Sequence, residues 1–166
     1  MAALIAIPVL GGLAILQSSI FSRLPLLHGS SDLIMLAIIA WALQKKTQTA
    51  WQWCIIGGLV ANLTSALPLG VPLMGYVLTT AIALLLRQRV WQVPILAMFL
   101  VTFAGTLISH GSTVFVLRLQ GDPIPVLEAF NLITLPSILL NLLFAVLVYA
   151  LAGELARWFY TEELAV

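Results

Sequence analysis

Uncharged polar side chains inside apolar runs are the first candidates for chemistry in this sequence. A polar group is costly inside a lipid bilayer, so each one is a functional candidate by default. Gln17, Asn62 and His110 fall in the middle or outer half of their runs, where nearby serines and threonines suggest a polar cluster open to the outside. The intramembrane candidates are Gln17, Asn62, His110, Asn131 and Asn141.

A structural role competes with this interpretation, because polar groups also pair between membrane helices and fix their packing. An unpaired amide near the middle of a membrane is costly, so Asn62 and Asn141 should each bond a neighbouring helix. The candidates inside the runs carry no charge, which argues against a proton-coupled transporter, since such proteins relay protons through buried acids and bases.

Signatures of enzymes are missing from the sequence. It holds no GxGxxG, no phosphate loop, no HExxH and no GxSxG. Ser109 and His110 are adjacent, so they face different directions on a helix. His28 and His110 lie on different segments, and no Cys/His cluster could hold a metal. We therefore predict a protein that is not an enzyme and binds neither cofactor nor metal.

Small residues recur at helical spacing on two segments. Gly57, Ala61 and Ser65 line one helix face, and Gly105 and Ser109 line another. Such stripes let helix backbones approach closely, either within the chain or against a partner. We expect one stripe to close the internal bundle and the other to bind a partner.

The positions of charges, prolines and glycines cut the chain into six apolar segments. A spanning helix needs about 20 mostly apolar residues. The first segment has no basic flank and no A-x-A cleavage site, so we expect a retained membrane helix. The third and fourth of these segments could instead form a re-entrant hairpin bent at Pro68–Pro72. The expected helices are Ala3–Phe21, Asp32 to just before Lys45, Trp51–Leu67, a fourth that ends at Leu86, Val93–Leu117, and Phe130–Trp158.

Composition indicates that lipid is the solvent. Of the 166 residues, 62% are hydrophobic and 8% are charged, whereas a soluble domain carries roughly 25% charged residues. The net charge of +1 argues against a nucleic-acid partner. We predict one all-α polytopic membrane domain over residues 1–166, with no loop long enough for a soluble domain.

Basic residues predict the orientation, because they concentrate in cytoplasmic loops. One side holds Lys45, Lys46, Arg87, Arg89 and Arg157, and the other holds Arg23 and Arg118. Both termini are then cytoplasmic. All five tryptophans fall near the cytoplasmic ends, where we expect them to be interfacial anchors.

Short motifs follow one another in order along nearly the whole chain. They are Leu16-Gln17-Ser18-Ser19-Ile20, Ser31-Asp32-Leu33-Ile34-Met35-Leu36, Gly57-Gly58-Leu59, Leu67-Pro68-Leu69-Gly70, Leu135-Pro136-Ser137, Asn141, and Val148-Tyr149. In this order they resemble the rod-shape-determining MreD family. Ser31 stands in place of the family's proline and Asn62 in place of its aspartate, so no role that needs a charge is expected at Asn62.

The resemblance implies a non-enzymatic member of the bacterial elongation machinery in the inner membrane. MreD proteins pair with MreC, which has one membrane helix and a large extracytoplasmic part. The pair is linked to MreB, RodA and a class B penicillin-binding protein, and it supports side-wall peptidoglycan synthesis and rod shape. The family also resembles the six-helix S components of energy-coupling-factor transporters, so an S-component-like bundle is expected.

Two functions remain open on the sequence alone. The first is a membrane scaffold of the MreD type. The second is an S component that binds a vitamin from outside, which needs an outward pocket with converging polar and aromatic groups. Short outward links disfavour the S component, whereas Ala2 and Ala6 have its Ala-xxx-Ala spacing. We therefore expect no tightly bound vitamin.

Overall fold

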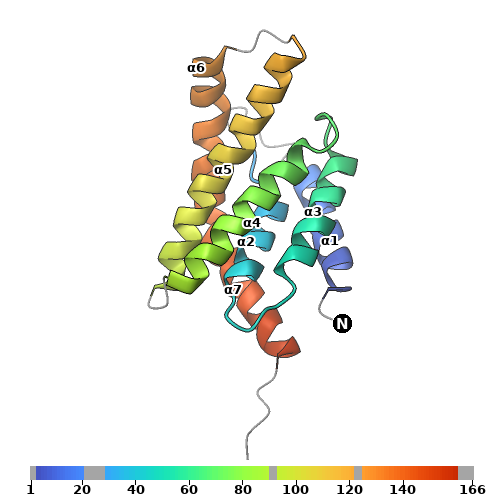
Figure 1. Cartoon of the computed structure of the whole chain (residues 1–166), viewed down its shortest axis with the longest axis vertical. Helices are drawn as coiled ribbons and strands as arrows, with labels where there is room; N and C mark the ends of the chain where they lie inside the picture. The colour runs from blue at the N-terminus through green and yellow to red at the C-terminus, as the bar shows by residue number, and fades with distance from the viewer. Residues whose placement is uncertain (1–2, 21–28, 90–92, 122–124, 161–166) are drawn as a thin grey trace, which may run out of the picture.

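The computed structural model describes residues 3–20, 29–89, 93–121 and 125–160, and they form a bundle of helices joined by short connections. Successive helical segments run in alternating directions along the long axis (Figure 1). The elements are α1 (Ala6–Ile20), α2 (Leu33–Leu43), α3 (Ala50–Thr64), α4 (Val71–Arg89), α5 (Pro94–Leu119), α6 (Val126–Ala129), the π-helix η2 (Phe130–Thr134) and α7 (Leu135–Phe159).

Three helical stretches are long and apolar enough to cross a membrane. They are Val71–Gln88, Pro94–Leu119 and Val126–Phe159. The stretches Ala6–Ser19 and Leu33–Leu43 are apolar but shorter. The predicted all-α class is confirmed for the described residues, and the long apolar helices are compatible with a membrane protein.

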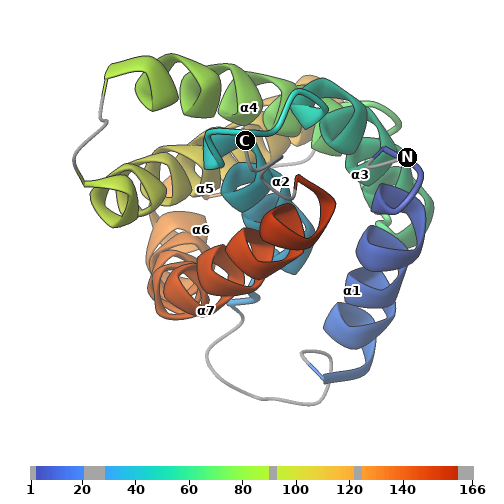
Figure 2. The same ribbon diagram turned by 90° about the horizontal axis from the view of Figure 1, so that it is seen from below.

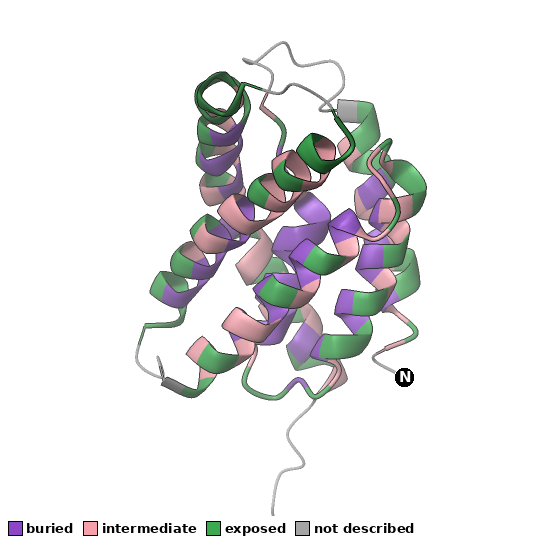
Figure 3. Ribbon diagram, turned by 45° about the horizontal axis from the view of Figure 1, so that its top comes forward, coloured by how far each residue is buried: buried purple, intermediate pink, exposed green. Residues whose placement is uncertain are grey.

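The centre of the bundle is α2. All eleven of its residues are buried, and the other helices surround it when the bundle is seen from below (Figure 2). In the burial map, purple gathers in the middle of the bundle, whereas the outer helices carry green on their outward sides (Figure 3). A helix of this length rises only about 16 Å, so α2 is a short apolar core element within longer neighbours.

The connection between α3 and α4 is a tight turn. Gly70 has a φ of 92°, a left-handed conformation that glycine adopts without steric cost. Its N–H donates to Asn62 Oδ1 at 3.1 Å. Asn62 therefore braces the turn at the end of its own helix, and the expected bond to a neighbouring helix is replaced by this local one.

The last helical run begins at Val126, four residues before the expected start, and contains the π-helical turn η2, which ends two residues before Pro136. Proline lacks an N–H, and its ring collides with the carbonyl four residues earlier in a regular helix. A wider π turn accommodates this mismatch within a continuous helix. The wider turn also buries Thr134 in the bundle.

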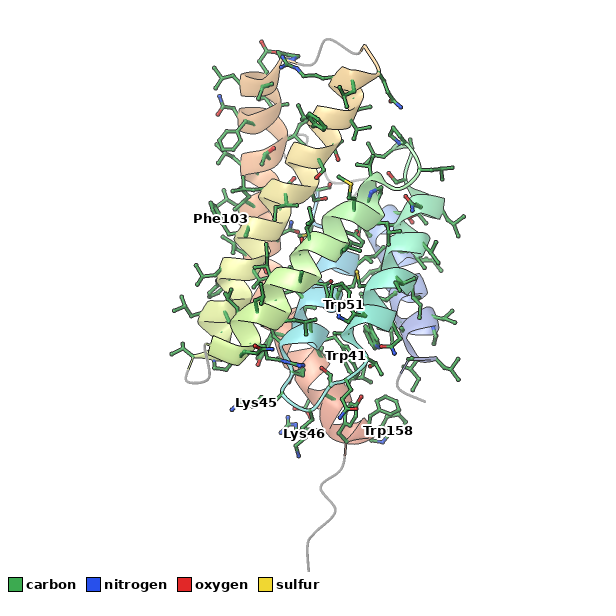
Figure 4. The ribbon with its side chains drawn as sticks, viewed as in Figure 1. Trp41, Lys45, Lys46, Trp51, Phe103 and Trp158 are labelled. Atoms are coloured by element: carbon green, nitrogen blue, oxygen red, sulfur yellow. The ribbon has the colours of Figure 1, made fainter. Side chains whose placement is uncertain are left out.

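The tryptophans divide into two kinds. Trp41 and Trp53 are 0% and 2% exposed and stack with ring centroids 4.2 Å apart. They belong to the core, so the expectation that they anchor the protein at an interface is wrong. Trp51 and Trp158 are exposed, and Figure 4 shows Trp158 beyond the lower ends of the other helices. Trp91 lies outside the described residues.

Candidate functional site

The N-terminal end of α2 is the most polar place in the core. The first backbone N–H groups of a helix have no partner within it and must be satisfied from outside. Asp32 caps the helix, since its Oδ1 accepts from the Met35 N–H at 2.9 Å. Gln17 Oε1, from α1, accepts from the Leu33 N–H at 3.0 Å. Two side chains from different segments thus complete one helix end.

Asn141 of α7 joins three segments at this end. Its Oδ1 accepts from the Asp32 N–H at 2.8 Å and from the Ser31 hydroxyl at 3.0 Å. Its Nδ2 donates to Thr106 Oγ1 of α5 at 3.0 Å. The side chain is 1% exposed, so water cannot replace these bonds. The prediction that Asn141 bonds neighbouring helices is confirmed.

Two further bonds tie the segment before α2 to its surroundings. Tyr76 of α4 donates its hydroxyl to Asp32, with 2.8 Å to each carboxylate oxygen. One turn before Asn141, Ser137 Oγ accepts from the Ser30 N–H at 3.1 Å. The polar network at this end therefore draws on α1, α4, α5 and α7 at once.

A cavity of about 440 Å³ opens beside this network. Its walls come from α1, α3, α4, α5 and η2 and from the segment before α2. Its polar wall includes Gln17, Asp32, Tyr76, Ser109, His110 and Thr134. The carboxylate and the amide oxygen accept hydrogen bonds, so the arrangement can bind water or a small polar molecule.

His110 is held at the wall of this cavity by one contact. Its Nδ1 lies 3.2 Å from Thr134 Oγ1 in the π turn. Among the described residues, no hydrogen bond joins His110 to Ser109 or to Asp32. A nucleophile and its base lie within hydrogen-bond reach in a typical catalytic arrangement. The geometry around His110 is that of a positioned polar side chain.

The predicted intramembrane polar cluster is partly assembled by the fold. Gln17 and His110 line the cavity, and Asn141 lies buried beside it. Asn62 does not join them, because its amide is used in the turn before α4. Asn131 is exposed on η2.

Sequence reasoning missed Asp32 and Tyr76 as members of the site. Asp32 is absent from the predicted polar cluster, although it forms part of the cavity wall. Its position was predicted correctly as the helix cap. A lone acid directly before an entirely apolar run was the signal that could have marked it.

The small-residue stripes face helices of the same chain. A Cβ built on Gly57 would lie 2.6 Å from Ile38 Cδ1 of α2, and one built on Gly105 would lie 2.6 Å from Thr79 Cγ2 of α4. Both glycines are buried, so the expectation that one stripe is left open is wrong at these positions. Ala61, Ser65 and Ser109 line the cavity.

The C-terminal end of α2 is completed in a different way. The last carbonyl groups of a helix lack internal partners. Arg87 of α4 donates through Nη1 to the carbonyls of Ala42, Gln44 and Thr47, at 3.3, 3.2 and 2.9 Å. The Thr47 hydroxyl lies 2.8 Å from the Trp41 carbonyl, to which it donates. A cation at a helix C-terminus also interacts favourably with the helix dipole.

In comparisons with known proteins, no family model, curated protein or solved structure matches this chain. The fold and the site define an all-helical protein with helices long and apolar enough for a membrane, and a short buried helix with a polar cavity at one end.

Proposed function

We propose that this chain is a non-enzymatic membrane scaffold of the MreD type. It acts in the bacterial inner membrane as part of the elongation machinery, where it binds an MreC-type protein and supports side-wall peptidoglycan synthesis and rod shape. Through that partner it is linked to MreB, RodA and a class B penicillin-binding protein.

One observation carries this proposal: the motifs behind the resemblance meet in space. Gln17, Asp32, Ser137 and Asn141 come from three separate motif regions and all bond at the N-terminal end of α2. Gly57, from a further motif, packs against α2 itself. Chance matches between apolar helices have no reason to converge on one network. The convergence supports a shared architecture as the origin of the motifs.

The proposed topology has six membrane crossings with cytoplasmic termini. The alternating helix directions in Figure 1 support it. So does the placement of basic residues, since Lys45, Lys46, Arg87 and Arg157 surround a single cavity, whereas Arg118 is at the far end of α5. Basic residues on one side of the bundle mark the cytoplasmic side.

The partner's membrane helix needs an open face, and the two internal stripes do not provide one. A groove of about 300 Å³ runs between α5 and the α6–η2 segment. Gly111 lies in it, with nothing within 4 Å of a built Cβ. Phe115 and Val126 stand exposed on its walls. Close approach at a small residue, with apolar side chains around it, is how membrane helices associate. The proposed docking face is this groove.

Capture of an MreC-type protein from the same genome tests the proposal. Gly111→Leu should fold normally and lose most of the co-purified partner, because the groove is filled. Gly12→Leu is the matched control: Gly12 is equally open, and α1 lies across the bundle from α5 (Figure 2). Failure of the wild-type chain to capture the partner would overturn the scaffold. Capture by Gly111→Leu at wild-type yield would overturn the docking face.

A second function, a ligand-binding S-component-like subunit, is favoured by the cavity near Asp32. Its volume of about 440 Å³ lies within the range of small-molecule sites, roughly 300–1,000 Å³. Native mass spectrometry of the purified chain separates the two functions. A scaffold should carry no stoichiometric small molecule other than lipid, and a reproducible bound vitamin would favour the transporter subunit.

A further inference from the structure

A second cavity, of about 250 Å³, lies at the C-terminal end of α2. Cations from three parts of the fold reach its wall. Lys45 and Lys46 follow α2, Arg87 comes from α4 and Arg157 from α7. Figure 4 shows Lys45 and Lys46 at the lower end of the molecule, the end at which Trp158 also lies. Four of the chain's seven lysines and arginines thus surround one small space.

Among the described residues, every charged side chain that lines this cavity is basic. Arg157 pairs with Glu154, and both side chains are largely exposed. Arg87 is directed at the carbonyls that end α2. No acidic residue lines the cavity among the described residues. A buried amide, Gln44 Nε2, has no partner of good hydrogen-bond geometry in the described part of the chain.

Other walls of the cavity are apolar. Leu43, Pro94, Ala97 and Ala156 contribute them. Pro94 and Ala97 belong to the first turn of α5, and the same helix continues with half-exposed apolar side chains. These are Leu96, Leu100 and Phe103, at 49%, 49% and 46% exposure. A cationic space therefore adjoins an apolar helix surface.

We propose that this cavity holds the phosphate headgroup of an anionic phospholipid, whose acyl chains lie along α5. Basic pockets between helices on the cytoplasmic side suit such headgroups, since the cations attract the phosphate and the Gln44 amide donates to an oxygen. Trp158, 72% exposed at this end, is of the type that lies at headgroup level. The inference rests on the proposed membrane orientation and does not depend on an MreC-type partner.

Native mass spectrometry of the delipidated full chain tests this inference, with three probes. They are phosphatidylglycerol, phosphatidylcholine with the same acyl chains, and inorganic phosphate. Phosphatidylglycerol should bind at one copy per chain and survive an excess of free phosphate. Removal of one cation should weaken it roughly fivefold, so Lys45→Gln with Lys46→Gln should weaken it roughly twenty-five-fold.

Arg157→Gln and Arg118→Gln form a matched pair, because each removes one exposed arginine from opposite ends of the bundle. Only Arg157→Gln should weaken lipid binding, with melting temperatures unchanged. Equal binding of the two lipids, displacement by free phosphate, or an equal effect of both arginine variants would each overturn the inference. Partner capture is measured in a separate experiment. A failure to capture the partner therefore does not change the interpretation of the lipid-binding result.

Discussion

The two ends of α2 satisfy the same requirement with opposite chemistry. At the N-terminal end, carboxylate and amide oxygens from Asp32, Gln17 and Asn141 accept the orphan N–H groups. At the C-terminal end, Arg87 and Thr47 donate to the orphan carbonyls. The first end shares its bonds among four other helices, and the second relies largely on one arginine. Each end adjoins a cavity: the acidic Asp32 lines the one at the N-terminal end, and the basic Arg87 lines the one at the C-terminal end.

This comparison shows why so short a helix can sit in the core. A buried helix without satisfied ends would leave polar backbone groups in an apolar surrounding, at a cost of several kilocalories per mole. Side chains from the surrounding helices remove that cost at both ends. They also fix the position of α2 within the bundle, because each bond is directional.

The largest loss of stability is expected at the N-terminal end of α2. Asn141→Leu removes three hydrogen bonds, which leaves the Asp32 N–H and the hydroxyls of Ser31 and Thr106 without this partner. At roughly 1 kcal/mol for each bond, the loss is about 3 kcal/mol. The melting temperature in detergent should fall clearly, while captured partner per folded chain stays near wild type.

Asn131→Leu is the control for this variant. Asn131 is exposed on η2, close in sequence to the same helix. The Asn131→Leu variant should melt within about a degree of wild type, since an exposed amide makes no bond in the core. Equal melting temperatures for both variants would show that the N-terminal network contributes nothing special to stability.

A smaller loss is expected at the other end. Arg87→Met keeps most of the side-chain length and removes the donor to three carbonyls, one of which still accepts from Thr47. We expect about 2 kcal/mol of destabilisation. Arg118→Met removes an exposed arginine and should change little. A larger loss for Arg87→Met than for Asn141→Leu would reverse the ranking of the two ends.

The smallest effect sharpens the comparison within the N-terminal end. Tyr76→Phe removes one hydroxyl from Asp32 and leaves the cap to Met35 intact. The expected destabilisation is about 1 kcal/mol. Tyr160→Phe keeps its ring near Trp41 and serves as the control. If Tyr76→Phe matched Asn141→Leu, the aspartate rather than the asparagine would be the centre of the network.

Much of the fold was predictable because it depends on local signals. Asp32 was recognised as a cap, since an acid before an apolar run has few other local roles. Charges, prolines and glycines divide the chain into segments that each overlap one of the observed helical runs, with ends that differ by up to four residues. The candidate site was predictable only in part: Gln17, His110 and Asn141 were found, and Asp32 and Tyr76 were not. A tyrosine in an apolar helix gives no sign in the sequence of the distant carboxylate it will meet.

The sequence by itself determined the class of the protein and its helical segments, through composition and through residues that begin and end helices. The tertiary structure alone decided which faces are inside. Trp41 and Trp53 became core residues, and Gly57 and Gly105 became internal contacts. The reason is physical: lipid and protein interior are both apolar, so a helix that faces either one carries the same kinds of residues, and no periodicity separates them.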